Sequence, residues 1–283
     1  MSYIVFLGDS YTFGEGLELF IENDKWIKRR ELRSEWAELQ PIQDEDSVKF
    51  RENNRFAKIV SDYFECEPIV DPLNGVHLGY NLELLEKSEE EVGIENIKAI
   101  VVQFSCTLRN PIHLNRYCRC SLCSKYNANP ISLFVSNVTE RDSYINHDWT
   151  KKIMSSFGKN EVDAEMMKWS FHFGNYLQKY TLDLFALKLQ RYEDYGIPIL
   201  TIDTWDEMDV HTRNNQWITD RLVKLKDNQG NYHTSWLDFQ KTFGQWGSIH
   251  RTFPKTMNGH PTPIVHQKVA ESLIENLKEK YET

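Results

Sequence analysis

The sequence predicts an α/β fold in which parallel strands alternate with helices. Three apolar segments, rich in β-branched and aromatic residues, are typical of buried strands: residues 3–7, 99–104 and 197–203. Segments with apolar residues at helical spacing lie between them. Strands that alternate with helices in this way usually form a parallel sheet with crossover helices.

The first predicted strand ends on a turn that carries a hydroxyl group. Residues 3–7 read YIVFL, and Gly8, Asp9 and Ser10 follow directly. Ligands of open α/β sheets bind at the carboxyl ends of the strands. The turn at Ser10 is therefore the first candidate for a functional site.

The remaining elements follow along the chain. We expect helices over residues 17–39 and 55–64, from Leu82 onward, over 164–195 and over 265–281, and a short strand at 68–70. Residues 204–254 are expected to be irregular, and their many aromatic residues to belong mainly to the core. The 283 residues are long enough for one large core, and we expect a single domain over 1–283.

Residues 109–163 interrupt the alternation of strands and helices. They are rich in Asn, Ser and Cys and show little periodicity, yet they carry Tyr117, Phe134, Tyr144 and Trp149. A linker would not need these aromatic side chains. We therefore expect an irregular insertion or lid on the α/β scaffold.

Charge and hydropathy exclude several classes of function. The net charge of -9 argues against nucleic acid bound over a broad basic surface. The start of the chain has no basic region ahead of an apolar one, and no later stretch has 18 uncharged apolar residues. We expect a cytoplasmic protein with no signal peptide and no membrane partner.

Two short motifs at opposite ends of the chain resemble those of the SGNH/GDSL hydrolases. The first is Gly8-Asp9-Ser10 with Gly14, and the second is residues 258–262, NGHPT, ahead of the last helix. The resemblance implies a flavodoxin-like, doubly wound parallel sheet in three α/β/α layers. It also implies that Ser10 is a nucleophile and His260 its base.

Residues 74–81, NGVHLGYN, resemble the family block whose glycine donates a backbone N–H to the oxyanion. Gly79 would be that residue, and Asp9 a positioning residue of the first block. His266 also falls where the family motif has a second histidine, but we expect it, like His77, to be structural.

The sequence departs from the family pattern at two points. The third block, Gly-x-Asn-Asp, is replaced by residues 105–108, SCTL, so Thr107 takes the place of the donor Asn, with Gln103 and Arg109 as alternatives. The family aspartate just before the histidine is also missing. Asn258 stands there and can orient the imidazole through its side-chain oxygen, and Asp203 at a strand end is an alternative carboxylate.

These residue types suit acyl transfer. A serine hydroxyl becomes a good nucleophile when a base takes its proton, and the pKa of histidine lies near neutrality. The oxyanion needs N–H donors already aimed at it, here the amides of Ser10 and Gly79 and one side chain. We expect a serine esterase that removes a short, acetyl-like acyl group from a carbohydrate or a small polar substrate, without a catalytic cofactor.

The two departures support an alternative from another class of function. The chain would then be a weakly active or inactive member of the fold that serves as a binding or structural module. Proteins that resemble it are frequent in bacteriophages, which would place it in the host cytoplasm or in a virion.

Three cysteines lie close together in the predicted insertion. Cys118, Cys120 and Cys123 form C-x-C-x-x-C, and His113 or Cys106 can supply a fourth ligand. Such a set can hold one structural zinc, which would stabilise an insertion without a core of its own. Reduced thiols in a loop are the equal alternative. The net negative charge of the chain disfavours a zinc-dependent module that binds nucleic acid.

Overall fold

The computed structural model describes residues 1–21, 44–70, 78–104, 109–111, 132–134, 180, 182–204, 215–252 and 260–282. At its centre lies a parallel sheet of four strands in the order β2-β1-β3-β6. The strands are β1 (Tyr3–Leu7), β2 (Glu67–Val70), β3 (Ile97–Phe104) and β6 (Ile199–Asp203). The predicted α/β class is confirmed.

Helices precede and follow these strands along the chain. The longer ones are α3 (Glu45–Asn54), α4 (Phe56–Tyr63), α5 (Leu78–Val92), a helix over 182–194, and α13 (Pro263–Glu282). The short ones are α1 (Ser10–Phe13), η1 (Leu17–Phe20), η3 (Ile94–Asn96), α10 (Gln216–Thr219), α11 (Trp236–Lys241), η4 (Gly244–Trp246) and α12 (Ile249–Thr252). Two small antiparallel pairs join β4 (Arg109–Pro111) to β5 (Ser132–Phe134) and β7 (Leu225–Lys226) to β8 (Tyr232–His233).

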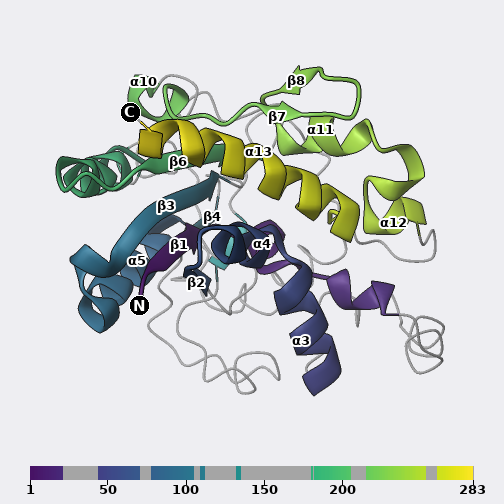
Figure 1. Ribbon diagram of the computed structural model, residues 1–283, viewed down its shortest axis with the longest axis horizontal. Coiled ribbons are helices and arrows are strands. Elements are labelled where there is room, and N and C mark those ends of the chain that lie inside the picture. The colour runs from purple at the N-terminus through teal and green to yellow at the C-terminus, as the bar shows by residue number, and fades with distance from the viewer. Residues whose placement is uncertain are drawn as a thin grey trace, which may run out of the picture.

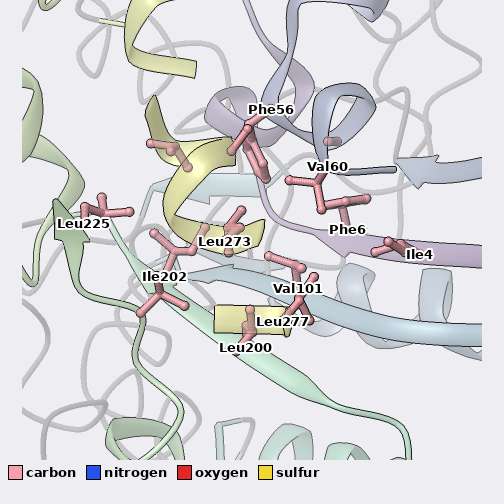
Figure 2. Close-up of a cluster of buried hydrophobic side chains, with 14 of the residues drawn as sticks. Ile4, Phe6, Phe56, Val60, Val101, Leu200, Ile202, Leu225, Leu273 and Leu277 are labelled. Carbon is pink, nitrogen blue, oxygen red and sulfur yellow. The ribbon is translucent and has the colours of Figure 1, made fainter. Parts of the chain in front are cut away.

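The sheet has an apolar core on each face, because successive side chains of a strand point to opposite sides. Ile4 and Phe6 of β1 belong to the core shared with α4, α11 and α13, part of which Figure 2 shows. Val5 and Leu7 belong to the core shared with α5 and the helix over 182–194. The described helices and the sheet therefore form three layers.

The last helix illustrates why these segments are helical. Its buried residues Val265, Val269, Leu273 and Leu277 recur at every fourth position and form one apolar stripe. This stripe packs against α4 and the sheet. Burial of each such side chain contributes roughly 1.5–3 kcal/mol to folding.

The arrangement brings the end of β1 and the start of α13 to the same edge of the sheet. In Figure 1, β1 and β3 run in the same direction, and α13 runs back the opposite way. The first residues of α13 thus lie toward the edge where the strands end. The chain moves from β1 to β2 on one side and then to β3 on the other side of β1. In such sheets, ligands bind in the crevice at this reversal, beyond the ends of β1 and β3.

Several elements differ from the expectation. Helix α5 begins at Leu78 rather than Leu82, and the described parts of residues 204–254 contain the β7–β8 pair and four short helices. Of the helix expected over 17–39, the described part is the single 3-10 turn η1. In the expected insertion, β4 and β5 form an antiparallel pair. None of the described helices is long and apolar enough to cross a membrane.

Candidate functional site at the end of the first strand

The turn after β1 is tightly packed. A side chain at Gly8 would place its Cβ 2.1 Å from the Thr12 hydroxyl oxygen and 2.6 Å from the Gln103 amide oxygen. Asp9 caps the short helix α1, because its carboxylate accepts a hydrogen bond from the Tyr11 N–H at 3.0 Å. The backbone of Ser10 begins that helix. The glycine is needed here because no side chain fits, and the aspartate fixes the direction in which the chain leaves the strand.

Gln103 ties this turn to the neighbouring strands. Its side-chain oxygen accepts hydrogen bonds from the Asp9 N–H at 3.1 Å and the Thr12 hydroxyl at 2.8 Å. Its amide nitrogen donates to the Thr204 hydroxyl at 2.5 Å. The sheet register explains this position, since Leu7 pairs with Val102 and the next residues, Gly8 and Gln103, lie side by side. Gln103 is thus a positioning residue for the turn.

Asn81 brings the first turn of α5 to the same place. Its side-chain oxygen accepts a hydrogen bond from the Gly8 N–H at 3.2 Å, and Asn81 is buried. Gly79 lies two residues earlier, in the first turn of that helix. The first N–H groups of a helix have no acceptor within the helix. The predicted oxyanion donor therefore lies on a helix end that contacts the turn.

His260 lies against the residue that follows Ser10. Its ring and that of Tyr11 are 5.0 Å apart between centroids, at a tilt of 52°. The His260 backbone carbonyl accepts a hydrogen bond from the Ile249 N–H at 2.8 Å, which ties the start of the last segment to α12. The structure thus brings the predicted base beside the predicted nucleophile's turn. The side chain of Ser10 lies outside what the structure describes.

A carboxylate faces the imidazole of His260. Glu15 Oε2 lies 3.6 Å from His260 Nε2, and the two side chains are 4% and 18% exposed. The contact becomes an ion pair when the ring is protonated. Analysis of the sequence did not single out Glu15. The only signal was its place between Gly14 and Gly16, five residues beyond Ser10.

A buried ion pair involves Glu18, three residues beyond Glu15 in the chain. Arg51 of α3 is 3.4 Å from Glu18, and both side chains are almost completely buried. The guanidinium of Arg51 also lies over the Phe13 ring, 4.6 Å from its centroid. Burial lowers the pKa of Arg55 to about 10, which still leaves it a cation at neutral pH. The site is therefore backed by charged groups removed from water.

His266 has the structural role that the sequence predicted for it. It is fully buried, it stacks on Phe56, and its Nδ1 accepts a hydrogen bond from the Phe56 N–H at 3.3 Å. Burial is the main reason that its pKa falls to about 3, with smaller contributions from His260 and Arg55. A ring that is neutral near pH 7 suits an acceptor for the first N–H of α4.

The other predicted residues divide into two groups. Asp203 ends β6, buried and in register with Phe104, and its backbone forms a bridge with Ser235. Arg109 begins β4. The rest lie outside the described residues: Thr107, Asn258, His77, His113, Cys106, Cys118, Cys120 and Cys123. Within the described part of the chain, no group of three or more His, Cys, Asp or Glu residues could hold a metal ion.

The aromatic residues near the end of the chain have different environments. Trp236 and Phe239 are fully buried in the core, whereas Trp246 is 47% exposed. The backbone carbonyl of Trp246 accepts a hydrogen bond from the Thr262 hydroxyl, two residues beyond His260. The β-bridge between Ser248 and Pro261 joins the same two segments, so the exposed Trp246 belongs to a segment that pairs with the one after His260.

Comparison with known proteins assigns no function to this site. No family model matches the chain, and neither a curated protein nor a solved structure is significantly similar to it. The function must therefore be argued from the site itself.

Proposed function

We propose that the chain is a serine ester hydrolase of the SGNH/GDSL type, with Ser10 as nucleophile and His260 as base. One observation carries the proposal: His260, from the far end of the sequence, lies against Tyr11 and faces a buried carboxylate. A histidine beside a serine-bearing turn and next to a carboxylate is the arrangement that activates a hydroxyl.

The strand order supports the same proposal. The order β2-β1-β3-β6 is the beginning of the flavodoxin-like order, in which the ligand lies at the reversal between the first and third strands. Ser10 follows β1 directly, at that reversal. We accordingly propose a flavodoxin-like, doubly wound sheet for the whole domain.

The proposed reaction proceeds through an acyl-enzyme. His260 takes the Ser10 proton as the hydroxyl oxygen attacks the ester carbonyl, and the oxyanion receives hydrogen bonds from the amides of Ser10 and Gly79. The alcohol leaves with the proton from the imidazolium. Water, deprotonated by His260, then attacks the acyl group and releases the acid, and Ser10 regains its proton.

The substrate class follows from the surroundings of the site. We propose a short acyl group on a carbohydrate, because the exposed Trp246 is joined through its backbone carbonyl to Thr262, two residues beyond His260, and an amphipathic ring is suited to pack on a sugar. No cofactor enters the reaction. A zinc ion on Cys118, Cys120 and Cys123, with His113 or Cys106, would only hold the insertion together.

The test is hydrolysis of 4-nitrophenyl acetate by the parent chain and by Ser10→Ala. We expect the substitution to reduce the rate by at least about 10³-fold, because the residual rate comes from the oxyanion donors and binding alone. Circular dichroism of both proteins checks that they are folded. Equal rates in the two folded proteins contradict the proposal.

The second candidate is an inactive binding or structural module of the same fold, as in a bacteriophage particle. The replacement of the family's third block by residues 105–108, SCTL, favours it. A fluorophosphonate probe separates the two candidates. Labelling of Ser10 supports the enzyme, and an unlabelled, well-folded chain without esterase activity supports the module.

A further inference from the structure

We propose that Glu15 is the acid member of this site: its carboxylate positions the His260 imidazole and stabilises the imidazolium formed during acyl transfer. The inference rests on the proposed function and adds to it a positioning residue from the opposite end of the chain. In the family that the motifs resemble, the acid precedes the histidine, where this chain has Met257 and Asn258.

The contact places a carboxylate within ion-pair distance of the ring nitrogen Nε2, which leaves Nδ1 as the nitrogen that takes the Ser10 proton. Glu15 Oε2 and His260 Nε2 are 3.6 Å apart, and the Glu15 side chain is only 4% exposed. A carboxylate that is shielded from water interacts more strongly with a neighbouring positive charge than an exposed one does. The distance is longer than a hydrogen bond, as is common in sites without substrate.

The backbone around Glu15 holds the carboxylate in place. Gly14 and Gly16, on either side of it, both have φ of +82°, a conformation that favours glycine. The Gly14 carbonyl accepts a hydrogen bond from the Leu17 N–H at 3.2 Å, and that of Gly16 from the Leu19 N–H at 3.0 Å. Glu15 thus lies on a double turn whose conformation is fixed on both sides.

Positively charged residues flank the turn that carries Glu15. The stems of Arg51 and Arg55 lie against the turn, since a Cβ on Gly14 would come within 3.2 Å of Arg55 and 3.5 Å of Arg51. Arg51 forms an ion pair with Glu18, which limits the net positive charge behind the site. The turn that carries Glu15 and the η1 segment after it therefore contain or contact two arginines and two glutamates.

Two further rings lie near His260, those of Tyr11 and His266. Tyr11 contributes a neutral ring at 5.0 Å, and His266 is neutral near pH 7 because its pKa is lowered to about 3. Arg55 contributes a positive charge near His266, and that charge helps to lower the pKa of His266. Among these groups, Glu15 is the one whose carboxylate faces the His260 ring.

Glu15→Gln tests the inference, because it removes the charge and keeps the size of the side chain. We expect kcat/KM for 4-nitrophenyl acetate to fall by roughly 10²–10⁴-fold, the range found when the acid of such a site becomes an amide. Glu15→Asp retains the charge and should recover part of the loss. The lower limb of the pH profile of kcat/KM should move to lower pH in Glu15→Gln.

A second readout does not depend on turnover. The pKa of the His260 imidazole, followed by NMR, should fall by about 1 or more in Glu15→Gln, because an opposite charge at this distance is lost. Asp227→Asn is the matched control. Asp227 is another buried carboxylate, 3.0 Å from His233 in the β7–β8 pair, and its removal should leave the His260 titration unchanged.

The outcomes separate the two proposals. An active parent whose Glu15→Gln variant keeps kcat/KM and the His260 pKa overturns the role of Glu15 and leaves the esterase proposal standing. Equal hydrolysis by parent and Ser10→Ala overturns the esterase proposal. In that event, a lowered His260 pKa in Glu15→Gln still supports the pairing of the two side chains, and an unchanged one overturns it.

Discussion

Two histidines six residues apart, at the start of the last helix, occupy opposite kinds of environment. His260 is partly exposed, faces the Glu15 carboxylate and contacts the ring of Tyr11. His266 is fully buried between aromatic rings, stacked on Phe56 and edge-on to Trp236. The same side chain is therefore placed once beside a carboxylate with access to water and once in an apolar core.

The difference shows what a histidine requires to act as a base. In His266, burial without a carboxylate partner lowers the pKa to about 3, and the ring serves as an acceptor for the first N–H of α4. Its Nε2 has no hydrogen-bond partner among the described residues. His260, by contrast, faces a carboxylate and remains partly accessible to water, as a base that exchanges protons with substrate and water requires.

The sharpest test of this contrast replaces each histidine by glutamine. His260→Gln removes the base, and we expect kcat for 4-nitrophenyl acetate to fall by about 10²–10⁴-fold with little change in stability. His266→Gln can still accept from the Phe56 N–H, so kcat should stay within a few-fold of the parent. Steady-state kinetics with thermal melting of both variants checks the prediction. Equal losses of kcat in the two folded variants would contradict the different roles of His260 and His266.

Gln103, a buried polar side chain, extends the comparison from the two histidines to the turn after β1. Gln103→Leu removes the acceptor for the Asp9 N–H and the Thr12 hydroxyl and the donor to Thr204. Because each buried group left without a partner costs about 1–3 kcal/mol, we expect the free energy of unfolding to fall by at least about 2 kcal/mol.

Urea unfolding of Gln103→Leu measures this loss. Val101→Ala, on the same face of β3, is the control for a purely apolar deletion. We expect Gln103→Leu to lower the esterase rate more than Val101→Ala does at equal loss of stability. The opposite ranking would show that Gln103 stabilises the sheet but does not position the turn for the reaction.

The pH dependence of the free energy of unfolding tests the environment of His266, the buried histidine. The folded-state pKa of His266 is about 3 and its ordinary value is 6.5, so the unfolded chain binds the proton first as the pH falls. The stability contributed by the neutral ring is complete above about pH 6.5 and is lost as the pH falls toward 3. The expected slope is up to about 1.4 kcal/mol per pH unit.

Urea unfolding at several pH values between 7 and 4 measures that slope. His266→Gln should unfold with a flatter dependence than the parent, since the carboxylates common to both contribute equally. Parallel curves for the two proteins would mean that His266 titrates normally in the folded chain.

The apolar pattern of the sequence predicted much of the fold. The segments 3–7, 99–104 and 197–203 became β1, β3 and β6, because burial on both faces leaves a continuous apolar run in each strand. The start of α5 was missed by four residues. Its first turn, with Gly79, carries few apolar residues, and its position depends on the long-range hydrogen bond from the Gly8 N–H to Asn81.

The site was predictable only where local motifs mark it. The pairing of the Ser10 turn with His260 followed from the resemblance, and the structure places the two segments together. Glu15 and the contacts of Gln103 left no local signal, because they join residues that the fold alone brings together. The sequence offered Asn258, in the place of the family aspartate, and Asp203, a carboxylate at a strand end, as partners of the histidine, and neither choice pointed to Glu15.

The most direct test of the central claim is the pH dependence of fluorophosphonate labelling, followed by intact mass and peptide mapping. We predict one adduct per chain, on Ser10, at a rate that rises with pH through the pKa of His260, falls at least about 10²-fold in His260→Gln, and shifts to lower pH in Glu15→Gln. A well-folded parent chain that takes up no label at Ser10, or labels there as fast without His260, would contradict the claim.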